Sequence, residues 1–292
     1  MKPVDQYSSL TVAIQALRDD RTLGASELAR MGLRIAAETA RQYRARSTEE
    51  LITYLNLAAD QLAHTRPSMA PVWNLLQQWR NSLGTLAKHD LEFARATAIT
   101  AAHSLEELSI HASRAAARNA ARMIEPNSTI ITHSLSSTVV EVFRQLKGRG
   151  IRVIVSESRP LYEGRNLATL LSGMKIPVTL ITDAQIGIFC REAAVALTGA
   201  DCILEDGAVV NKAGTYLLAL ASRDQRVPFY VCYESFKQRL PDMESFTLES
   251  MDPEELGTPK PSAISVKNVY FDITPRTLVD GWITEQGAKV IP

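Results

Sequence analysis

The pattern of hydrophobic and polar positions changes near Pro126. Before it, apolar residues recur at helical spacing, and alanine and leucine, which favour helices, are frequent. We expect four helices there, over residues 26–43, 48–63, 71–82 and 85–124. The last helix carries an arginine every four residues, which fits either a solvated helix face or an interface. These arginines are Arg114, Arg118 and Arg122.

After Pro126, short runs of β-branched and aromatic residues predict strands. The runs are 129–132, 151–155, 178–181, 202–204, 229–232 and 269–271. Helix-like stretches lie between the earlier runs, at 137–147, 164–172, 185–197 and 214–224. Strands that alternate with helices predict an α/β fold in which helices cover both faces of a mostly parallel sheet.

These patterns divide the chain into a helical domain, residues 1–125, followed by a Rossmann-like α/β domain, residues 126–292. Residues 238–265 hold four prolines and several acids, and they predict a surface excursion before the last strand. The Gly-x-Gly-x-x-Gly fingerprint is missing from the sequence, so the pattern does not indicate a dinucleotide.

Composition narrows the class of protein. Hydrophobic residues make up 46% and charged residues 22%, which allows a sizeable core and argues against global disorder. Equal numbers of basic and acidic residues, 32 of each, argue against a general nucleic-acid binder. No run approaches the ~18 apolar residues of a membrane span, so we expect no membrane association.

The cysteines suggest where the chain resides. There are three, Cys190, Cys202 and Cys232, an odd number without the spacing of metal ligands. We therefore expect free thiols in a reducing compartment, the cytoplasm, and no bound metal.

Three segments carry residues suited to binding an anion. Residues 132–138 follow a predicted strand and open a helix, where hydroxyls and unpaired N–H groups can bind phosphate, or where Ser136 or Ser137 can simply cap the helix. Arg159 leaves the next strand, and its guanidinium suits phosphate oxygens or a neighbouring carboxylate. Arg66 lies in a loop restrained by proline.

The segment 199–215 is the most informative. It reads as a small-residue turn, a short apolar strand, a second turn and a helix start at Asn-Lys-Ala-Gly-Thr. This order places Asp201, Asn211 and Lys212 near the carboxyl ends of strands, where open α/β sheets bind ligands.

The motifs together resemble one superfamily. It holds the α, β and δ regulatory subunits of eukaryotic translation initiation factor 2B, methylthioribose-1-phosphate isomerase and ribose-1,5-bisphosphate isomerase. The resemblance is dense over residues 126–287 and thinner before them. The matching motifs are Thr65-Arg-Pro, Thr132-His-x-x-Ser, Glu157-Ser-Arg-Pro-x-x-x-Gly, Gly199-Ala-Asp, Gly207-Ala-Val, Asn211-Lys-x-Gly-Thr and Phe271-Asp-x-Thr-Pro.

The resemblance implies a catalytic pair and shows that one member is changed. The isomerases use a cysteine and an aspartate, and Asp201 matches the aspartate, whereas Ser134 stands where they have the cysteine. A serine hydroxyl is a far weaker acid than a thiol, whose pKa is about 8.5, and positioned acid–base groups contribute about 10² to 10⁴ in rate. The resemblance therefore makes Ser134 the main departure from an active isomerase.

A second departure lies in the helical half. The isomerases carry an Arg-Gly-Ala turn whose arginine helps to bind phosphate, and this chain has Leu23 before Gly24 and Ala25. Arg21 could replace that arginine only if the loop bends differently. The other phosphate-binding positions that the resemblance implies are retained: Arg66, Ser136, Ser137, Arg159, Asn211 and Lys212.

The first hypothesis is a regulatory or catalytically impaired member that binds a phosphorylated sugar or nucleotide in a pocket at the domain junction. The alternative is an aldose–ketose isomerase of ribose 1,5-bisphosphate or a related sugar 1-phosphate, in which Asp201 and Ser134 or a water exchange protons. A third reading is a structural subunit with a vestigial pocket. The resemblance implies a homodimer or higher homo-oligomer that pairs through the α/β half, and it implies no organic cofactor.

Overall fold

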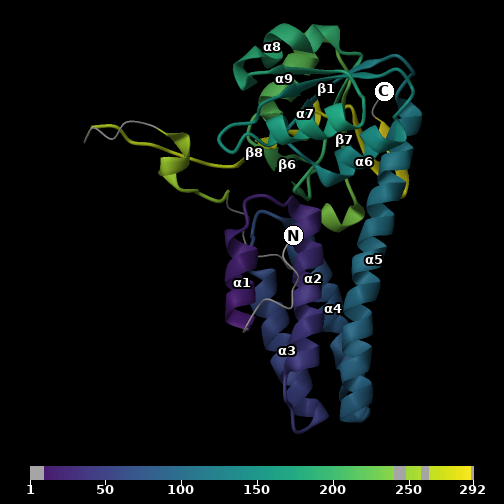
Figure 1. Ribbon diagram of the computed structural model, residues 1–292, viewed down its shortest axis with the longest axis vertical. Coiled ribbons are helices and arrows are strands. Elements are labelled where there is room, and N and C mark those ends of the chain that lie inside the picture. The colour runs from purple at the N-terminus through teal and green to yellow at the C-terminus, as the bar shows by residue number, and fades with distance from the viewer. Residues whose placement is uncertain (1–9, 240–247, 258–262, 291–292) are drawn as a thin grey trace. The chain divides into compact units, whose positions relative to one another are not determined.

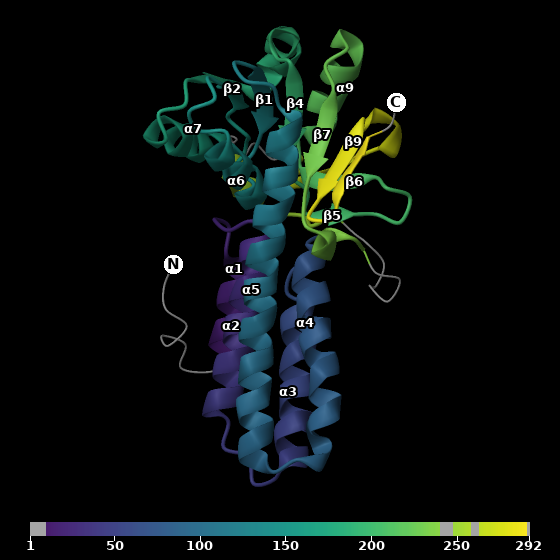
Figure 2. The same cartoon turned by 90° about the vertical axis from the view of Figure 1, so that its right-hand side faces the viewer.

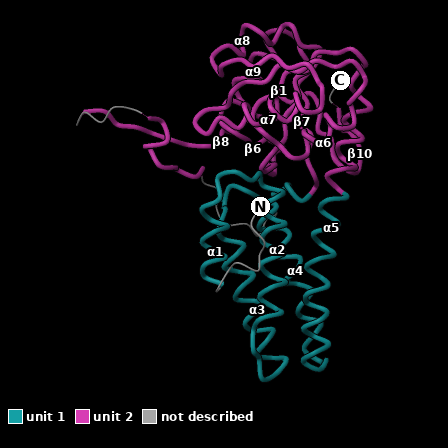
Figure 3. The backbone as a smooth tube through the Cα atoms, in the orientation of Figure 1, with its two compact units in different colours: residues 1–111, 236–244 teal, residues 112–235, 245–292 magenta. Residues whose placement is uncertain are grey.

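The computed structural model describes residues 10–239, 248–257 and 263–290 (Figure 1). The chain divides into two compact units (Figure 3). Unit 1 comprises residues 1–111 and 236–244, and unit 2 comprises residues 112–235 and 245–292. The domain limit at residue 125 that the sequence suggests stays a prediction.

Unit 1 is helical, as the sequence predicts. Its helices are α1 (Leu10–Asp19), α2 (Ala25–Gln42), α3 (Thr48–Ala63), α4 (Ala70–Leu83) and the first part of α5 (Leu91–Met123), with the short 3₁₀ helix η2 (Gly84–Lys88). Local signals set the helix starts: the Ser47 hydroxyl accepts the Glu50 N–H at 3.1 Å, and Pro71 lies in the first turn of α4. The predicted helix 85–124 begins later than expected, because η2 occupies its start.

Buried polar contacts tie the unit 1 helices together. The Trp79 indole N–H donates to Ala98 O at 2.8 Å, and the Arg95 guanidinium donates to Tyr43 O at 2.8 Å. The Asn74 side-chain amide donates to Phe236 O and Gln238 O, each at 2.7 Å. Asn74 thereby fixes the short segment from far along the chain that belongs to this unit.

Unit 2 is built on a seven-stranded sheet in the order β10-β9-β7-β4-β1-β2-β3 (Figure 2). Six of the strands are parallel, and β10 is antiparallel to β9 at one edge. The strands are β1 (Thr129–His133), β2 (Arg152–Ser156), β3 (Val178–Ile181), β4 (Val195–Thr198), β7 (Phe229–Cys232), β9 (Gly281–Thr284) and β10 (Gly287–Val290). The α/β fold with a mostly parallel sheet is confirmed.

Alternating side chains of the strands build a core on each face of the sheet. Ile130 of β1 packs with the last turns of α5 and with α6 (Ser137–Gln145) and α7 (Glu163–Gly173). Its neighbour Ile131 packs on the other face with α8 (Ile186–Phe189) and α9 (Thr215–Gln225). Because successive strand residues point to opposite faces, one apolar run fills both layers.

Two sequence predictions in unit 2 are wrong. The stretch 185–197 is not one helix but α8 between the 3₁₀ helices η3 (Asp183–Gln185) and η4 (Cys190–Glu192), followed by the central strand β4. An apolar run of this length fits a buried strand or a buried helix equally well, so periodicity alone did not separate them. Two further strands, β9 and β10, follow the one expected to be last.

A second, three-stranded sheet accounts for another difference. It has the order β5-β6-β8, is antiparallel, and consists of β5 (Cys202–Ile203), β6 (Val209–Lys212) and β8 (Phe271–Thr274). Asn211 and Lys212 end β6, a strand that the sequence analysis did not predict, and they lie near the carboxyl end of a strand as expected. Helix α9 begins at Thr215, one residue after the start of the predicted stretch 214–224.

The arginines of α5, the segment 238–265 and the absence of a membrane span were also predicted from the sequence. Arg114, Arg118 and Arg122 are all exposed, as a solvated helix face would be. Within 238–265, the structure describes 238–239, 248–257 and 263–265, including the 3₁₀ helix η6 (Pro253–Leu256), and the rest of this excursion lies outside the described residues. Among the described helices, none is long and apolar enough to cross a membrane.

Candidate functional site

The strand order of the large sheet reverses between β1 and β4. From β1 the chain proceeds outward to β2 and β3, and from β4 it proceeds the other way to β7 and β9. Open α/β sheets bind ligands at such a point, outside the carboxyl ends of the strands. The segments that leave β1 and β4 there carry Ser134, Ser136 and Ser137 on one side and Asp201 on the other.

These two segments are in contact. Gly199 has no side chain, and a Cβ placed there would lie 2.3 Å from Ser136 Oγ. The same hydroxyl accepts the Val139 N–H and caps α6, so the capping role considered from the sequence is observed. Among the described residues, none makes a hydrogen bond with the hydroxyl of Ser137, the first residue of α6.

A buried imidazole joins the end of β1 to its neighbours. His133 Nε2 lies 2.8 Å from Ala213 O, and Nδ1 lies 2.6 Å from Ser156 Oγ. A carbonyl oxygen can only accept, so Nε2 carries the proton and Nδ1 accepts the Ser156 hydroxyl. Burial lowers the pKa of His133, which keeps the ring neutral and suits this arrangement.

The backbone of Ser134 is held in a left-handed conformation, with φ 66°. Its N–H donates to Ser158 Oγ at 2.8 Å, and the Ser158 N–H donates to Asp183 Oδ1 at 2.8 Å. The other oxygen of Asp183 accepts the Arg159 N–H at 2.7 Å. The carboxylate that follows β3 thus fixes the loops that follow β2 and β1, and the strain at Ser134 marks this turn as a functional candidate.

The Ser134 side chain has no base beside it. Among the described residues, none makes a hydrogen bond or an ion pair with its hydroxyl, although Ser134 is half-buried. Asp201 is also half-buried, and its N–H donates to Val210 O at 2.8 Å, which links it to β6. The two residues predicted as a catalytic pair therefore follow strands of the same sheet, and within the described ranges their side chains make no hydrogen bond with each other.

Arg159 is committed to contacts within unit 2. Its guanidinium donates to Leu256 O at 3.0 Å and to the Tyr162 hydroxyl, and it lies 4.8 Å from the centre of the Tyr162 ring. Arg165 lies 3.8 Å from the same ring and pairs with Glu157 at 2.6 Å. The carboxylate of this loop is therefore paired with Arg165.

Asn211 and Lys212 are buried and hold neighbouring elements. Lys212 Nζ lies 2.6 Å from Glu163 Oε1 and 4.3 Å from the centre of the Tyr270 ring. The Asn211 amide donates to the Thr215 hydroxyl at 2.9 Å, in the first turn of α9. Glu163 Oε2 is buried without a hydrogen bond, so the Lys212 ammonium is the main compensation for this carboxylate.

Asp272 is a carboxylate that the sequence interpretation did not select. Its Oδ2 accepts the Gly214 N–H at 2.7 Å and the Tyr216 N–H at 3.1 Å, at the start of α9. Its Oδ1 is buried without a hydrogen bond. Burial raises the pKa of Asp272 to about 6, against the effect of the two N–H donors.

Unit 1 holds the remaining predicted residues. Gly24 caps α2 with no side chain, and the buried Ala25 begins the helix. The Arg66 guanidinium is buried and donates to Asp20 O at 3.0 Å. Arg21 donates to Arg18 O at 2.7 Å, so it turns back onto the end of α1 instead of extending from the Leu-Gly-Ala turn.

The residues that sequence reasoning missed are His133, Ser158, Asp183 and Asp272. A usable signal existed for each of them. His133, Ser158 and Asp272 lie within the motifs Thr132-His-x-x-Ser, Glu157-Ser-Arg-Pro-x-x-x-Gly and Phe271-Asp-x-Thr-Pro, and Asp183 follows the carboxyl end of β3. The described part of the chain contains no group of three His, Cys, Asp or Glu residues that could hold a metal ion. The carboxyl edge of the large sheet can offer a ligand three kinds of group: serine hydroxyls, backbone N–H groups at the start of α6 and the Asp201 carboxylate.

We predict that Gly214→Ala destabilises unit 2 by about 2–4 kcal/mol. Gly214 has φ +112°, and a Cβ there would lie 2.6 Å from His133 Cε1, so both the backbone and the imidazole would have to move. The matched control is Gly173→Ala, because a Cβ at Gly173 has no atom within 4 Å. Urea unfolding of both variants measures the difference, and equal stability of the two variants would contradict the packing described for His133.

The raised pKa of Asp272 predicts that the free energy of unfolding depends on pH. Between its ordinary pKa of 3.8 and about 6, the folded chain binds this proton more tightly than the unfolded chain, so its contribution to stability falls as pH rises through that range. Asp272→Asn keeps an acceptor for α9 but cannot ionise. We expect the variant to gain on the order of 2 kcal/mol relative to the unaltered protein between pH 4 and pH 7. Denaturant unfolding across this range measures it, and parallel stability curves would contradict the assignment.

Comparisons with known proteins agree with this architecture. The family model of the initiation factor 2 subunit family matches residues 21–290. A solved structure of the Pyrococcus horikoshii translation initiation factor eIF-2B superposes with a TM-score of 0.83 and 35% identity, covering 98% of each chain. A putative translation initiation factor eIF-2B subunit 2-like protein of the same organism is 38% identical, covering 96% of this chain and 95% of that protein.

The isomerases also match over most of their length. A ribose 1,5-bisphosphate isomerase of Archaeoglobus fulgidus is 30% identical, covering 94% of this chain and 88% of that enzyme. A methylthioribose-1-phosphate isomerase of Syntrophotalea carbinolica is 31% identical, covering 86% of this chain and 79% of that enzyme. The chain therefore belongs to the initiation factor 2 subunit family, a group that includes sugar-phosphate isomerases.

Proposed function

We propose that the chain binds a phosphorylated sugar or nucleotide at the carboxyl edge of its α/β sheet and does not isomerise it. The observation that carries the proposal is Ser134, a hydroxyl with no base hydrogen-bonded to it among the described residues, where the resemblance places a catalytic cysteine. Without a base, a serine hydroxyl near neutral pH neither gives up nor returns a proton at a useful rate.

Binding is supported by groups that survive around this hydroxyl. The first turn of α6 offers unpaired backbone N–H groups and the free Ser137 hydroxyl, which together suit the oxygens of a phosphate. Asp201 supplies an acceptor for sugar hydroxyls from the neighbouring strand end. Arg159, Asn211 and Lys212 fix the loops at this edge through their own contacts. We propose that they also contact the phosphate directly.

The second candidate is an aldose–ketose isomerase of ribose 1,5-bisphosphate. It is favoured by Asp201, which matches the catalytic aspartate of the isomerases, and by 30% identity to a ribose 1,5-bisphosphate isomerase. In that case a water would have to take the place of the thiol beside Ser134. Cys190, Cys202 and Cys232 are buried thiols that form no disulfide among the described residues, which fits a reducing compartment such as the cytoplasm for either function.

We expect ribose 1,5-bisphosphate to bind without conversion when the protein is followed by phosphorus NMR. Ser137→Asp should weaken binding at least about tenfold, because it puts a carboxylate where the phosphate would lie while remaining favourable at a helix start. The control Ser104→Asp adds the same charge at an exposed position of α5 and should leave binding unchanged.

The same experiment includes Ser134→Cys and Asp201→Asn. Conversion by the unaltered protein that disappears in Asp201→Asn would make the chain an isomerase and overturn the leading proposal. Conversion only by Ser134→Cys would show that the unaltered site lacks nothing but the catalytic thiol, in line with the proposal.

We also infer a homodimer through unit 2. Helix α9 leaves Tyr216, Leu217 and Leu220 exposed by 38%, 56% and 40%, and the adjoining strand β8 exposes Ile273 by 38%. Neighbouring apolar side chains at this exposure mark a protein interface more often than an ordinary surface. A second copy is the occupant that the family resemblance implies.

Leu217→Glu should therefore dissociate the dimer. Light scattering coupled to size-exclusion chromatography should give twice the chain mass of 32.2 kDa for the unaltered protein and the chain mass for the variant. Leu170→Glu, at a position of α7 that is 44% exposed, is the control and should remain dimeric. A Leu217→Glu protein that stays dimeric would place the interface elsewhere.

A further inference from the structure

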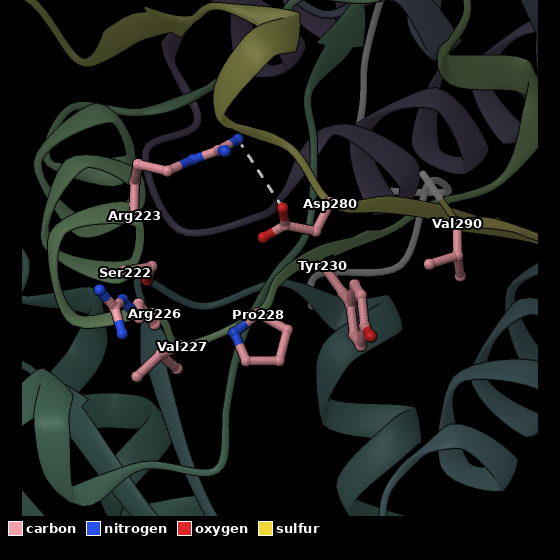
Figure 4. Close-up of a pocket in the computed structure, with 8 residues that line it drawn as sticks. All are labelled: Ser222, Arg223, Arg226, Val227, Pro228, Tyr230, Asp280 and Val290. Atoms are coloured by element: carbon pink, nitrogen blue, oxygen red, sulfur yellow. Dashed lines mark ion pairs between the residues drawn. The ribbon is translucent and has the colours of Figure 1, made fainter. Parts of the chain in front are cut away.

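A cleft of about 390 Å³ lies at the opposite end of the large sheet from the site described above. It opens where β7 and β9 begin, beside Val227, Pro228 and Asp280, whereas the proposed phosphate site lies at the carboxyl ends of the strands (Figure 4). All of its lining residues belong to unit 2. The volume is sufficient for a small organic molecule.

A glycine lies between two residues that line this cleft. Gly281 begins β9 between the Tyr230 ring and Val290 of the edge strand β10. A Cβ at position 281 would lie 3.0 Å from Tyr230 Cδ1 and 3.3 Å from Val290 Cγ2, so a larger residue would disturb both. Pro228, Tyr230 and Val290 form the apolar wall of the cleft.

The cleft is lined by two arginines, Arg223 and Arg226, and one carboxylate, Asp280, so its lining carries a net positive charge. Arg223 Nη2 lies 3.7 Å from Asp280 Oδ1, and the other oxygen of Asp280 accepts the Phe229 N–H at 2.8 Å. This carboxylate is thus fully engaged, and Arg223 compensates its charge. Arg226 remains as a second cation: its side chain is exposed and makes no hydrogen bond or ion pair with any residue in the described ranges 10–239, 248–257 and 263–290.

Arg226 also occupies a position that favours another residue. It ends α9 with φ 59°, in the left-handed conformation that glycine adopts freely and that costs other residues about 1 kcal/mol or more. Figure 4 shows Arg226 at one end of the cleft and Val290 at the other, with Pro228 and Tyr230 between them. A guanidinium at one end and apolar side chains beside it suit a ligand that carries an anionic group on an apolar body.

We propose that this cleft binds a small organic anion, with its phosphate or carboxylate on Arg226 and its apolar body against Pro228, Tyr230 and Val290. The half-buried Tyr230 carries a hydroxyl with no hydrogen bond to the described residues, and this group can donate a second bond to the ligand. The site is separate from the proposed phosphate site and does not depend on it.

Phenyl phosphate is a suitable probe, because it combines one phosphate with one apolar ring. In amide-resolved NMR of the labelled full chain, it should shift the signals of Val227, Tyr230 and Asp280 with a dissociation constant on the order of 1 mM. Inorganic phosphate and phenol, which each lack one half of the ligand, should bind at least about fivefold more weakly. Benzoate in place of phenyl phosphate distinguishes a carboxylate preference from a phosphate preference, and binding of either supports the proposal.

The decisive variant is Arg226→Gly. It removes the guanidinium and relieves the left-handed strain, so its melting temperature should not fall, and phenyl phosphate binding should weaken about tenfold. Lys175→Gly is the matched control, because Lys175 follows α7 in the same conformation, with φ 63°, and it does not line the cleft. The control should bind as the unaltered protein does.

Four results would overturn the proposal. Three of them are the absence of shifts up to about 20 mM phenyl phosphate, an affinity that Arg226→Gly leaves unchanged, and shifts confined to Ser134 and Ser136. The last result would place the anion at the carboxyl edge of the sheet. Binding of inorganic phosphate as tight as that of phenyl phosphate would also overturn it, because the apolar wall would then contribute nothing.

Discussion

The neutral imidazole of His133 is the constraint on which the rest of the site depends. One ring accepts from Ser156 at the end of β2 and donates to Ala213 in the turn between β6 and α9. The large sheet, the small sheet and α9 are thereby joined at one point. Because the ring is buried, each nitrogen needs a partner, and here one nitrogen donates while the other accepts.

Around this ring, hydrogen bonds between the loops that follow the first three parallel strands fix these loops relative to one another. Asp183 orders Ser158, which in turn orders the Ser134 backbone. The second oxygen of Asp183 holds the Arg159 N–H, so one carboxylate fixes two neighbouring residues of the loop after β2. The conformation of the turn at Ser134 therefore depends on backbone and carboxylate contacts, and the Ser134 side chain takes no part in them.

Much of the fold could be predicted from the sequence, and the failures have a common cause. Periodicity located helices α2 to α4 and strands β1 to β3, because their apolar residues have one period and clear ends. It failed at 185–197, where four short elements follow one another within one apolar run. It also missed β6, since the partner strand β8 that pairs with it lies far along the chain.

The candidate site was predictable to a similar extent. Residues in motifs next to strand ends, such as Ser136 and Asp201, could be selected because the carboxyl edge of a parallel sheet is defined by the strand order. The pairing of Lys212 with Glu163 could not, because it joins the end of β6 to the start of helix α7, which only tertiary structure brings together. The raised pKa of Asp272 belongs to the same class, since it arises from burial, which the local sequence does not encode.

The last turns of α5 have a consequence for how the sequence can change over evolution. Ala116, Ala117, Ala120 and Ala121 face the core, where any larger side chain would push the helix away from the sheet. Arg114, Arg118 and Arg122 on the same turns are exposed. We expect these two faces to diverge at different rates among relatives, so that this one helix alternates between positions restricted to the smallest residues and positions that vary freely.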